Sequence, residues 1–186
     1  MKDTLTRVED IAPIGHREAM ELAEAEYKRF ADVLAQLEPD DWAKQTVNDD
    51  WDVKQLVAHN LGFGESNASF RVFAKAMRAG KKPMGSYLMD VVFTRDTWMH
   101  RIDICRAVGL DPVLTSQHDG RLIEDMVAEW ARLYGLDVTL HLEGTAGRTY
   151  VSGTGDEDLA IDAVEWIWIL SGRGAGTGLL AKELPL

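Results

Sequence analysis

Apolar residues recur at a helical spacing through the first part of the chain, and proline, glycine and aspartate interrupt the pattern. Pro13 suits the first turn of a helix. Asp52 and Gln55 stand three residues apart, which is the spacing of a capping box at a helix start. The pattern predicts four helices, over residues 13–37, 52–79, 86–108 and 116–134. Four helices in succession favour a helix bundle.

The pattern changes after residue 136. Residues 137–144 alternate between polar and apolar side chains, a turn-forming TAGR segment follows, and TYVSG continues as a second strand, so a β-hairpin is predicted. A last helix is predicted over residues 156–170. The expected fold is mainly α: a four-helix bundle of residues 1–135 and a small C-terminal α/β appendage, residues 136–186, of hairpin plus helix. The appendage is too small to fold alone, so it should pack on the bundle.

Composition narrows the function classes. The 186 residues carry a net charge of −11, which argues against nucleic-acid binding. No stretch approaches the roughly 20 apolar residues of a membrane span, so no membrane partner is expected. The single cysteine, Cys105, excludes an internal disulfide. Because no signal peptide is recognised at the start, we expect the protein in the cytoplasm.

Two predicted helices place polar side chains among apolar ones. Asp96 and His100 are four residues apart, so they lie one above the other on a helix. A helical projection puts both in the stripe that also contains Ile104 and should face the core. The same projection puts His59 beside Leu56, at the edge of the inward face of the second helix. Two imidazoles and one carboxylate are therefore predicted to point inward.

Burying such groups without partners is unfavourable, and two arrangements remove that cost. One is a hydrogen-bond network within the core, in which no metal binds. The other is a divalent metal bound by His59, Asp96 and His100, for which zinc is the first expectation and nickel the alternative. Three protein ligands leave a coordination position open, as in catalytic rather than structural sites.

The motifs around these residues resemble a known family. The segment WDVKQLVAHN, residues 51–60, resembles the signature W-[ST]-V-x-x-L-x-x-H of the mycothiol-dependent maleylpyruvate isomerase family, within the DinB-like superfamily. DTWMHRIDI, residues 96–104, resembles that family's E-x-x-x-H-R-x-D. Residues 142–173 resemble its C-terminal subdomain, including the closing GR. The likeness covers nearly the whole chain in order.

The resemblance implies a DinB-like four-helix bundle that holds a divalent metal through His59, Asp96 and His100. It also implies a low-molecular-weight thiol such as mycothiol, which adds to a cis double bond and leaves after rotation, or is transferred to an electrophile. A C-terminal arginine contributes to activity in the family, and Arg173 is the candidate here. The alternative for Arg173 is a helix-terminal arginine that complements the helix dipole. Two features depart from the family: Asp96 replaces the usual glutamate, and the C-terminal region is short.

Three functional hypotheses follow. The first is a metal-dependent enzyme that uses a mycothiol-type thiol for isomerisation or S-transfer on a small electrophilic substrate. The second is a non-catalytic metal- or ligand-binding protein of the same fold. The third is a helical domain with a polar core network and no metal. The partners expected are small molecules, and the oligomeric state is left open, with a homodimer as one expectation.

Two neighbours of the candidate ligands have two interpretations each. Asp103 could accept a hydrogen bond from a ligand imidazole, or form a salt bridge within the bundle. Trp51 precedes the predicted N-cap and is expected to act as a hydrophobic staple rather than as a substrate contact.

Overall fold

The computed structural model describes residues 5–68 and 91–184, which form two compact units. The helical unit comprises residues 15–113, and the sheet unit comprises residues 1–14 together with 114–186. This division differs from the predicted one of 1–135 and 136–186. The fourth predicted helix and the N-terminal residues group with the sheet. The mainly helical fold with a small α/β appendage is confirmed.

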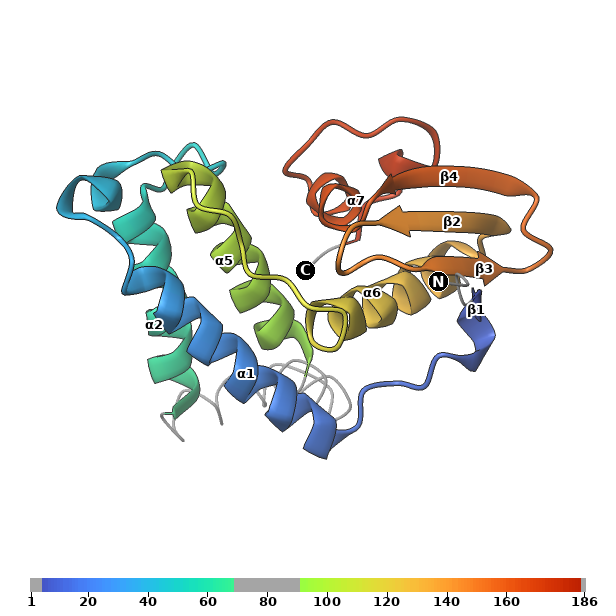
Figure 1. Cartoon of the computed structure of the whole chain (residues 1–186), viewed down its shortest axis with the longest axis horizontal. Helices are drawn as coiled ribbons and strands as arrows, with labels where there is room; N and C mark the ends of the chain where they lie inside the picture. Colours follow the sequence, from blue (N-terminus) through green and yellow to red (C-terminus); the bar gives the residue numbers. More distant parts are fainter. Residues whose placement is uncertain (1–4, 69–90, 185–186) are drawn as a thin grey trace. The chain divides into compact units, whose positions relative to one another are not determined.

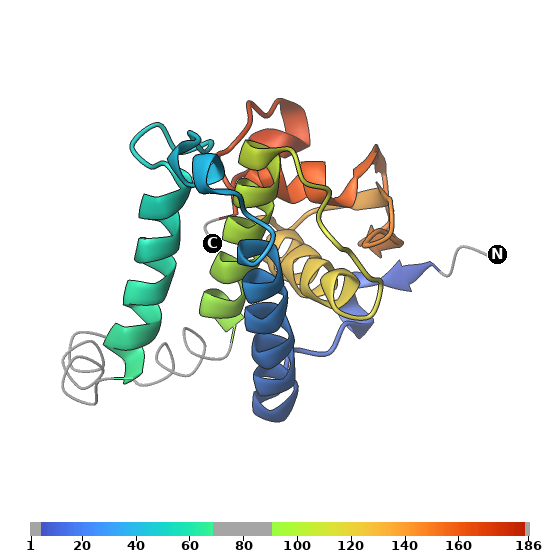
Figure 2. The same cartoon turned by 60° about the vertical axis from the view of Figure 1, so that its left-hand side comes forward.

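The helical unit contains three described α-helices and one short 3-10 helix (Figure 1). They are α1 (His16–Leu34), η2 (Pro39–Ala43), α2 (Val53–Ala68) and α5 (Phe93–Val108). Helix α5 contacts both α1 and α2, and Figure 2 shows the three helices from a second side. The predicted helix segments over residues 69–79 and 86–90 lie outside the described residues.

Helix α1 begins later than predicted. Gly15 is its N-cap and has an extended backbone, so Pro13 lies before the helix rather than in its first turn. At the other end the amide of Leu37 bonds the carbonyl of Leu34, a tighter spacing than in an α-helix. This is why the helix ends at Leu34 although the apolar pattern continues to Leu37.

The start of α2 is confirmed as a capping box. The Asp52 carboxylate accepts a hydrogen bond from the Gln55 amide at 2.8 Å, and the Gln55 side chain accepts one from the Asp52 amide at 2.9 Å. Two otherwise unpaired backbone donors are thereby satisfied. The inward faces of the three helices then form one apolar core. It consists of Phe30, Val33, Val53, Leu56, Val57, Ile104 and Cys105.

Helix α5 is buried over most of its surface, including many polar side chains. Eleven of its sixteen residues are buried. Arg101, next to His100, forms a buried ion pair with Glu26 of α1, with Nε to Oε1 at 2.6 Å and Nη2 to Oε2 at 3.3 Å. A fork of two hydrogen bonds fixes orientation as well as distance, so this pair sets how α5 lies against α1.

The sheet unit contains four described strands in the order β1-β3-β2-β4. They are β1 (Thr6–Arg7), β2 (Val138–Glu143), β3 (Thr149–Ser152) and β4 (Glu157–Asp162). Strands β2 and β3 are antiparallel, which confirms the predicted hairpin. Strand β1 pairs in parallel with β3, and β4 pairs in parallel with β2. Both parallel pairings lie outside the sequence-based prediction.

The predicted helix over residues 156–170 is wrong in its first half, because residues 157–162 form β4. Side-chain exposure alternates along this strand, and Leu159 and Ile161 are its half-buried positions. Asp162 then caps the helix α7 (Ala163–Leu170), accepting hydrogen bonds from the amides of Val164 and Glu165. The cap sets where strand ends and helix begins.

Helices α6 (Asp119–Tyr134) and α7 complete the core of the sheet unit. Trp130 of α6 and Trp166 of α7 are fully buried, and their rings meet edge to face with centroids 5.5 Å apart. The Trp130 indole also donates a hydrogen bond to the Lys182 carbonyl at 2.7 Å, beyond the short helix η4 (Gly178–Ala181). Helix α6 also contacts the 3-10 helix η1 (Val8–Asp10), which lies near the N-terminus of the chain.

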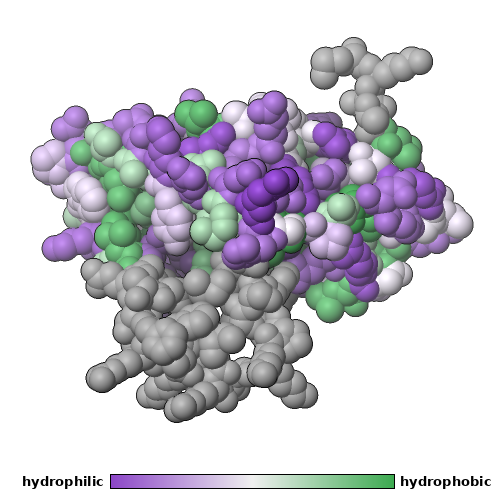
Figure 3. Space-filling view, turned by 90° about the horizontal axis from the view of Figure 1, so that it is seen from below, coloured by the Kyte–Doolittle hydropathy of each residue, from purple (hydrophilic) through white to green (hydrophobic). Residues whose placement is uncertain are grey.

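None of the helices in the described ranges combines the length and the apolar character that crossing a membrane requires. On the face drawn in Figure 3, hydrophilic residues are interspersed with smaller groups of hydrophobic ones. The exposed large apolar side chains of the helical unit include Met20 and Tyr27 on α1 and Leu61 on α2. A few exposed apolar side chains of this kind are normal on a protein surface.

The carboxylate of Asp137 organises the loop between β3 and β4. It accepts hydrogen bonds from the amides of Gly155 and Asp156 and from the Thr154 hydroxyl. The loop needs glycine at 153 and 155, where φ is +64° and +78°. The hydrogen bonds, led by that from the Asp156 amide, lower the pKa of Asp137 below its ordinary value of 3.8.

We expect Asp137 to contribute to stability in a pH-dependent way. A carboxyl whose pKa is lowered by folding stabilises the native state above its unfolded pKa, and that contribution disappears as the pH falls through the folded value. The stability difference between wild type and Asp137→Asn should therefore be largest above about pH 5 and shrink on acidification below about pH 4. Urea unfolding across this range measures it. Parallel stability curves for the two proteins would contradict the prediction.

Candidate metal centre

The structure brings the three predicted ligand residues together within the helical unit. His59 comes from α2, and Asp96 and His100 come from α5. Each offers one ligand atom, and these atoms lie within 4.8 Å of one another. The rings of His59 and His100 have centroids 5.6 Å apart and are nearly perpendicular, at 82°. Convergence is therefore observed, whereas ligation stays a prediction.

The helical repeat of α5 positions two of the three groups. Asp96 and His100 are one turn apart, and Asp96 Oδ1 lies 3.4 Å from His100 Nε2. The His100 side chain is only 7% exposed, but that of Asp96 is 26% exposed. His59 is also half-buried. The cluster thus has a buried imidazole on one side and two partly exposed groups on the other.

A second carboxylate, that of Asp103, contacts the other ring nitrogen of His100, Nδ1. Asp103 Oδ2 lies 3.1 Å from His100 Nδ1, and the Asp103 side chain is buried. An ionised carboxylate only accepts hydrogen bonds, so the proton of a neutral imidazole lies on Nδ1 and the lone pair lies on Nε2. Buried Nε2 makes no hydrogen bond. Of the two interpretations of Asp103, the structure supports the one in which it orients an imidazole.

The environment of His59 favours its neutral form. Partial burial lowers the pKa of His59 from its ordinary value of 6.5, the neighbouring His100 lowers it further, and Asp96 opposes the shift. A neutral imidazole is the form that binds a metal. The Trp51 ring also packs on that of His59, with centroids 4.4 Å apart and planes tilted by 35°.

The sequence pattern predicts Trp51 as a hydrophobic staple at the helix start and does not predict its contact with His59. A hairpin-like bridge between Gln45 and Asp52 turns the chain back just before α2. The Trp51 carbonyl accepts hydrogen bonds from the amide and hydroxyl of Thr46. This folded-back segment directs the indole along α2 to His59, two turns into the helix. The eight-residue spacing alone could not reveal it.

Arg173, the predicted catalytic residue, lies in the sheet unit after α7. Its amide bonds the Trp168 carbonyl at 3.1 Å, and the Gly172 amide bonds that of Ile169 at 3.0 Å. With φ of +79° at Gly172, this is a Schellman motif that ends the helix. The backbone of Arg173 thus has a structural role at the helix end, and a role of its side chain in catalysis stays a prediction.

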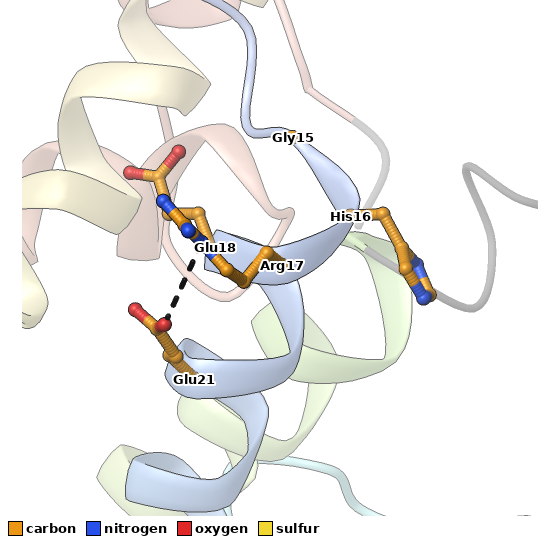
Figure 4. A pocket seen from close by; sticks show the side chains of 5 residues that line it. All are labelled: Gly15, His16, Arg17, Glu18 and Glu21. Atoms are coloured by element: carbon orange, nitrogen blue, oxygen red, sulfur yellow. Dashed lines mark ion pairs between the residues drawn. The ribbon is translucent and has the colours of Figure 1, made fainter.

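A separate open hollow lies at the start of α1 (Figure 4). Gly15, His16, Arg17, Glu18 and Glu21 line it. His16 points away from Glu18 and Glu21, and Arg17 pairs with Glu21 at 3.9 Å, with both side chains highly exposed. Exposed pairs of this kind are weak, and the side chains do not converge on a common point. The hollow therefore has less chemical organisation than the cluster on α2 and α5.

A family model matches a segment of the helical unit. The model described as the mycothiol maleylpyruvate isomerase N-terminal domain matches residues 23–89. These are 67 of the 186 residues of the chain. The match includes His59 and the capping box of α2, and it ends before Asp96 and His100. The match supports, for this segment, the family suspected from the sequence. No curated protein and no solved structure matches the chain.

The matched model is described by its place in mycothiol maleylpyruvate isomerase, and the resemblance predicts a relation to DinB-like metal-binding proteins. The residues brought together on α2 and α5 are chemically suited to that relation, because two imidazole nitrogens and a carboxylate oxygen are common ligands of divalent transition metals. The buried Nε2 of His100, which makes no hydrogen bond and lies 3.4 Å from Asp96 Oδ1, is the observation that fits a metal best.

We expect the metal-free protein to carry the His100 proton on Nδ1. Two-bond ¹H–¹⁵N spectra of histidine-labelled protein at about pH 8 distinguish the two neutral tautomers, and the spectrum of His100→Gln assigns the signal. Asp103→Leu removes the acceptor and should shift His100 toward a mixture of tautomers. An Nε2–H tautomer in the wild type would contradict the geometry described here.

Proposed function

We propose that His59, Asp96 and His100 bind one divalent transition metal and that the protein uses the site to activate a low-molecular-weight thiol. The observation that carries this proposal is the buried Nε2 of His100, which has no hydrogen bond and faces the Asp96 carboxylate at 3.4 Å. Ligands about 2.0–2.2 Å from one metal lie roughly 3–4 Å from each other, so this separation suits shared coordination.

The chain's own groups would perform distinct tasks around the metal. Asp103 holds the His100 ring in the tautomer and orientation that present Nε2. The lowered pKa of His59 keeps its imidazole available near neutral pH. Trp51 packs on the His59 ring and restricts its rotation. Zinc or nickel, when bound, supplies Lewis-acid activation that lowers the pKa of a thiol placed in the open coordination position.

The reacting thiol is proposed to come from solution, because the chain's own cysteine is unsuited to the task. Cys105 is the single cysteine and is fully buried in the core of the helical unit. Burial raises the pKa of its thiol, which disfavours the reactive thiolate. A mycothiol-type small thiol agrees with the family of the matched domain. The proposed reaction class is isomerisation or S-transfer on a small electrophile.

Metal analysis tests the binding part of the proposal. Purified wild-type protein should retain about one zinc or nickel per chain after dialysis, whereas His59→Ala and His100→Ala should retain almost none. His141→Ala is the matched control, because His141 is an exposed histidine on β2. Full metal content in His59→Ala and His100→Ala would refute the proposed ligands.

A thiol assay tests the catalytic part. Metal-loaded wild-type protein should accelerate the reaction of mycothiol with maleylpyruvate or with small electrophiles, and metal-free protein and His59→Ala should not. Bacillithiol and glutathione test which thiol is accepted. A protein that binds its metal through these residues but accelerates no reaction of any of the three thiols would be a non-catalytic metal-binding protein.

A further inference from the structure

A buried polar pair joins the two helices beside the candidate ligands. Asn60 follows His59 on α2, and Thr97 follows Asp96 on α5. The Asn60 amide nitrogen donates a hydrogen bond to the Thr97 hydroxyl at 3.1 Å. Asn60 is 3% exposed and Thr97 is 1% exposed. This hydrogen bond therefore lies within the packed interface of α2 and α5, one residue along from the site.

The two helices do not contribute equally to the site. The distance between Asp96 and His100 is set within α5, by the repeat of a single helix. The distance from His59 to that pair depends instead on how α2 is placed along α5. A slip of one residue along a helix moves a side chain by about 1.5 Å, whereas a functional site tolerates about 0.5 Å. The site therefore needs a contact that fixes the position of α2 against α5.

Apolar packing alone fixes that position poorly. Val53, Leu56 and Val57 of α2 pack in the core, and similar apolar residues can repack with little preference for one register. A hydrogen bond is directional and short-ranged, so it selects one register over its neighbours. Buried polar groups of this kind are best known for specifying register rather than for adding stability.

The oxygen of the Asn60 side-chain amide also supports a role of this residue in setting the helix register. Asn60 Oδ1 is buried and has no hydrogen-bond partner. Exchanging the amide oxygen and nitrogen would still leave one end unpaired, because Thr97 engages only one of them. A buried amide with an unpaired end is less favourable than an apolar residue of similar size. Asparagine at this position is thus poorly explained by packing and better explained by the bond to Thr97.

We propose that Asn60 is a positioning residue, which through its hydrogen bond to Thr97 sets the register of α2 on α5 and so holds His59 at coordination distance from Asp96 and His100. This inference rests on the metal site proposed above. It adds a residue that touches neither metal nor substrate and whose effect reaches the site through the placement of a helix.

Zinc affinity measured by competition with a chelating dye tests the inference. Thr97→Val and the double variant Asn60→Leu/Thr97→Val should bind zinc at least about 10-fold more weakly than the wild type, because His59 would no longer be held within the roughly 0.5 Å that a functional site tolerates. Thr97→Ser keeps the hydroxyl and should bind zinc about as tightly as the wild type. The visible spectrum of the cobalt-loaded proteins should change in the double variant, because the ligand geometry changes.

The double variant separates positioning from general stability. It replaces both polar partners by apolar side chains, so metal-free protein should unfold at or above the wild-type temperature while zinc affinity falls. Unchanged affinity and cobalt spectrum in the folded double variant would overturn the inference. An affinity as low in Thr97→Ser as in Thr97→Val would overturn it too.

Failure of the inference can be told apart from failure of the proposed function. His59→Ala measured in the same zinc titration decides this. If His59→Ala binds zinc like the wild type, the proposed ligands are wrong and the positioning role falls with them. If His59→Ala loses zinc and the double variant binds normally, the metal site stands and only the role of Asn60 is rejected.

Discussion

The burial of polar side chains on α5 is the constraint on which the helical unit depends. Eleven of the sixteen residues of this helix are buried, and a buried polar group is costly unless it is paired. Arg101 is paired with Glu26 on α1, Thr97 with Asn60 on α2, and His100 with Asp103 on α5 itself. The first two pairs join different helices and are directional, so satisfying them fixes α1 and α2 around α5 more narrowly than apolar packing would.

Two of the buried polar atoms that make no hydrogen bond lie where the proposed chemistry is. His100 Nε2 and Asn60 Oδ1 are buried without hydrogen bonds, and both belong to the α2–α5 interface or its edge. Natural sequences are locally consistent with their folds, and departures from that consistency concentrate at functional sites. A core designed only for stability would place apolar residues at both positions. The cost of retaining polar ones therefore points to function.

The sequence predicted the candidate ligands because their placement follows from local geometry. Asp96 and His100 share a helical repeat, and His59 falls on the inward edge of a second helix whose capping box marks its start. Asp103 could be suspected for the same reason. The bond between Asn60 and Thr97 could not be predicted, since the register of two helices depends on contacts between residues distant in sequence.

The differences between the predicted fold and the observed fold have a common physical origin. Residues 157–162 form a strand only because β2 lies beside them, and a short segment with mixed polarity does not reveal a partner of that kind. Strand β1 has two residues and is defined by its pairing with β3 alone. Asp162, by contrast, is a local signal for the start of α7, as its two hydrogen bonds to following amides demonstrate.

The pairing of β1 with β3 has a consequence for how the chain folds. Thr6 lies opposite Tyr150 in the sheet. The sheet unit is therefore assembled from two stretches of sequence, and the residues of the helical unit come between these stretches along the chain. During synthesis the helical unit emerges complete before the strand that β1 needs. Contacts between residues far apart in sequence form slowly, because the intervening chain must first be brought together. The N-terminal strand is thus expected to dock late, as the closing step of assembly.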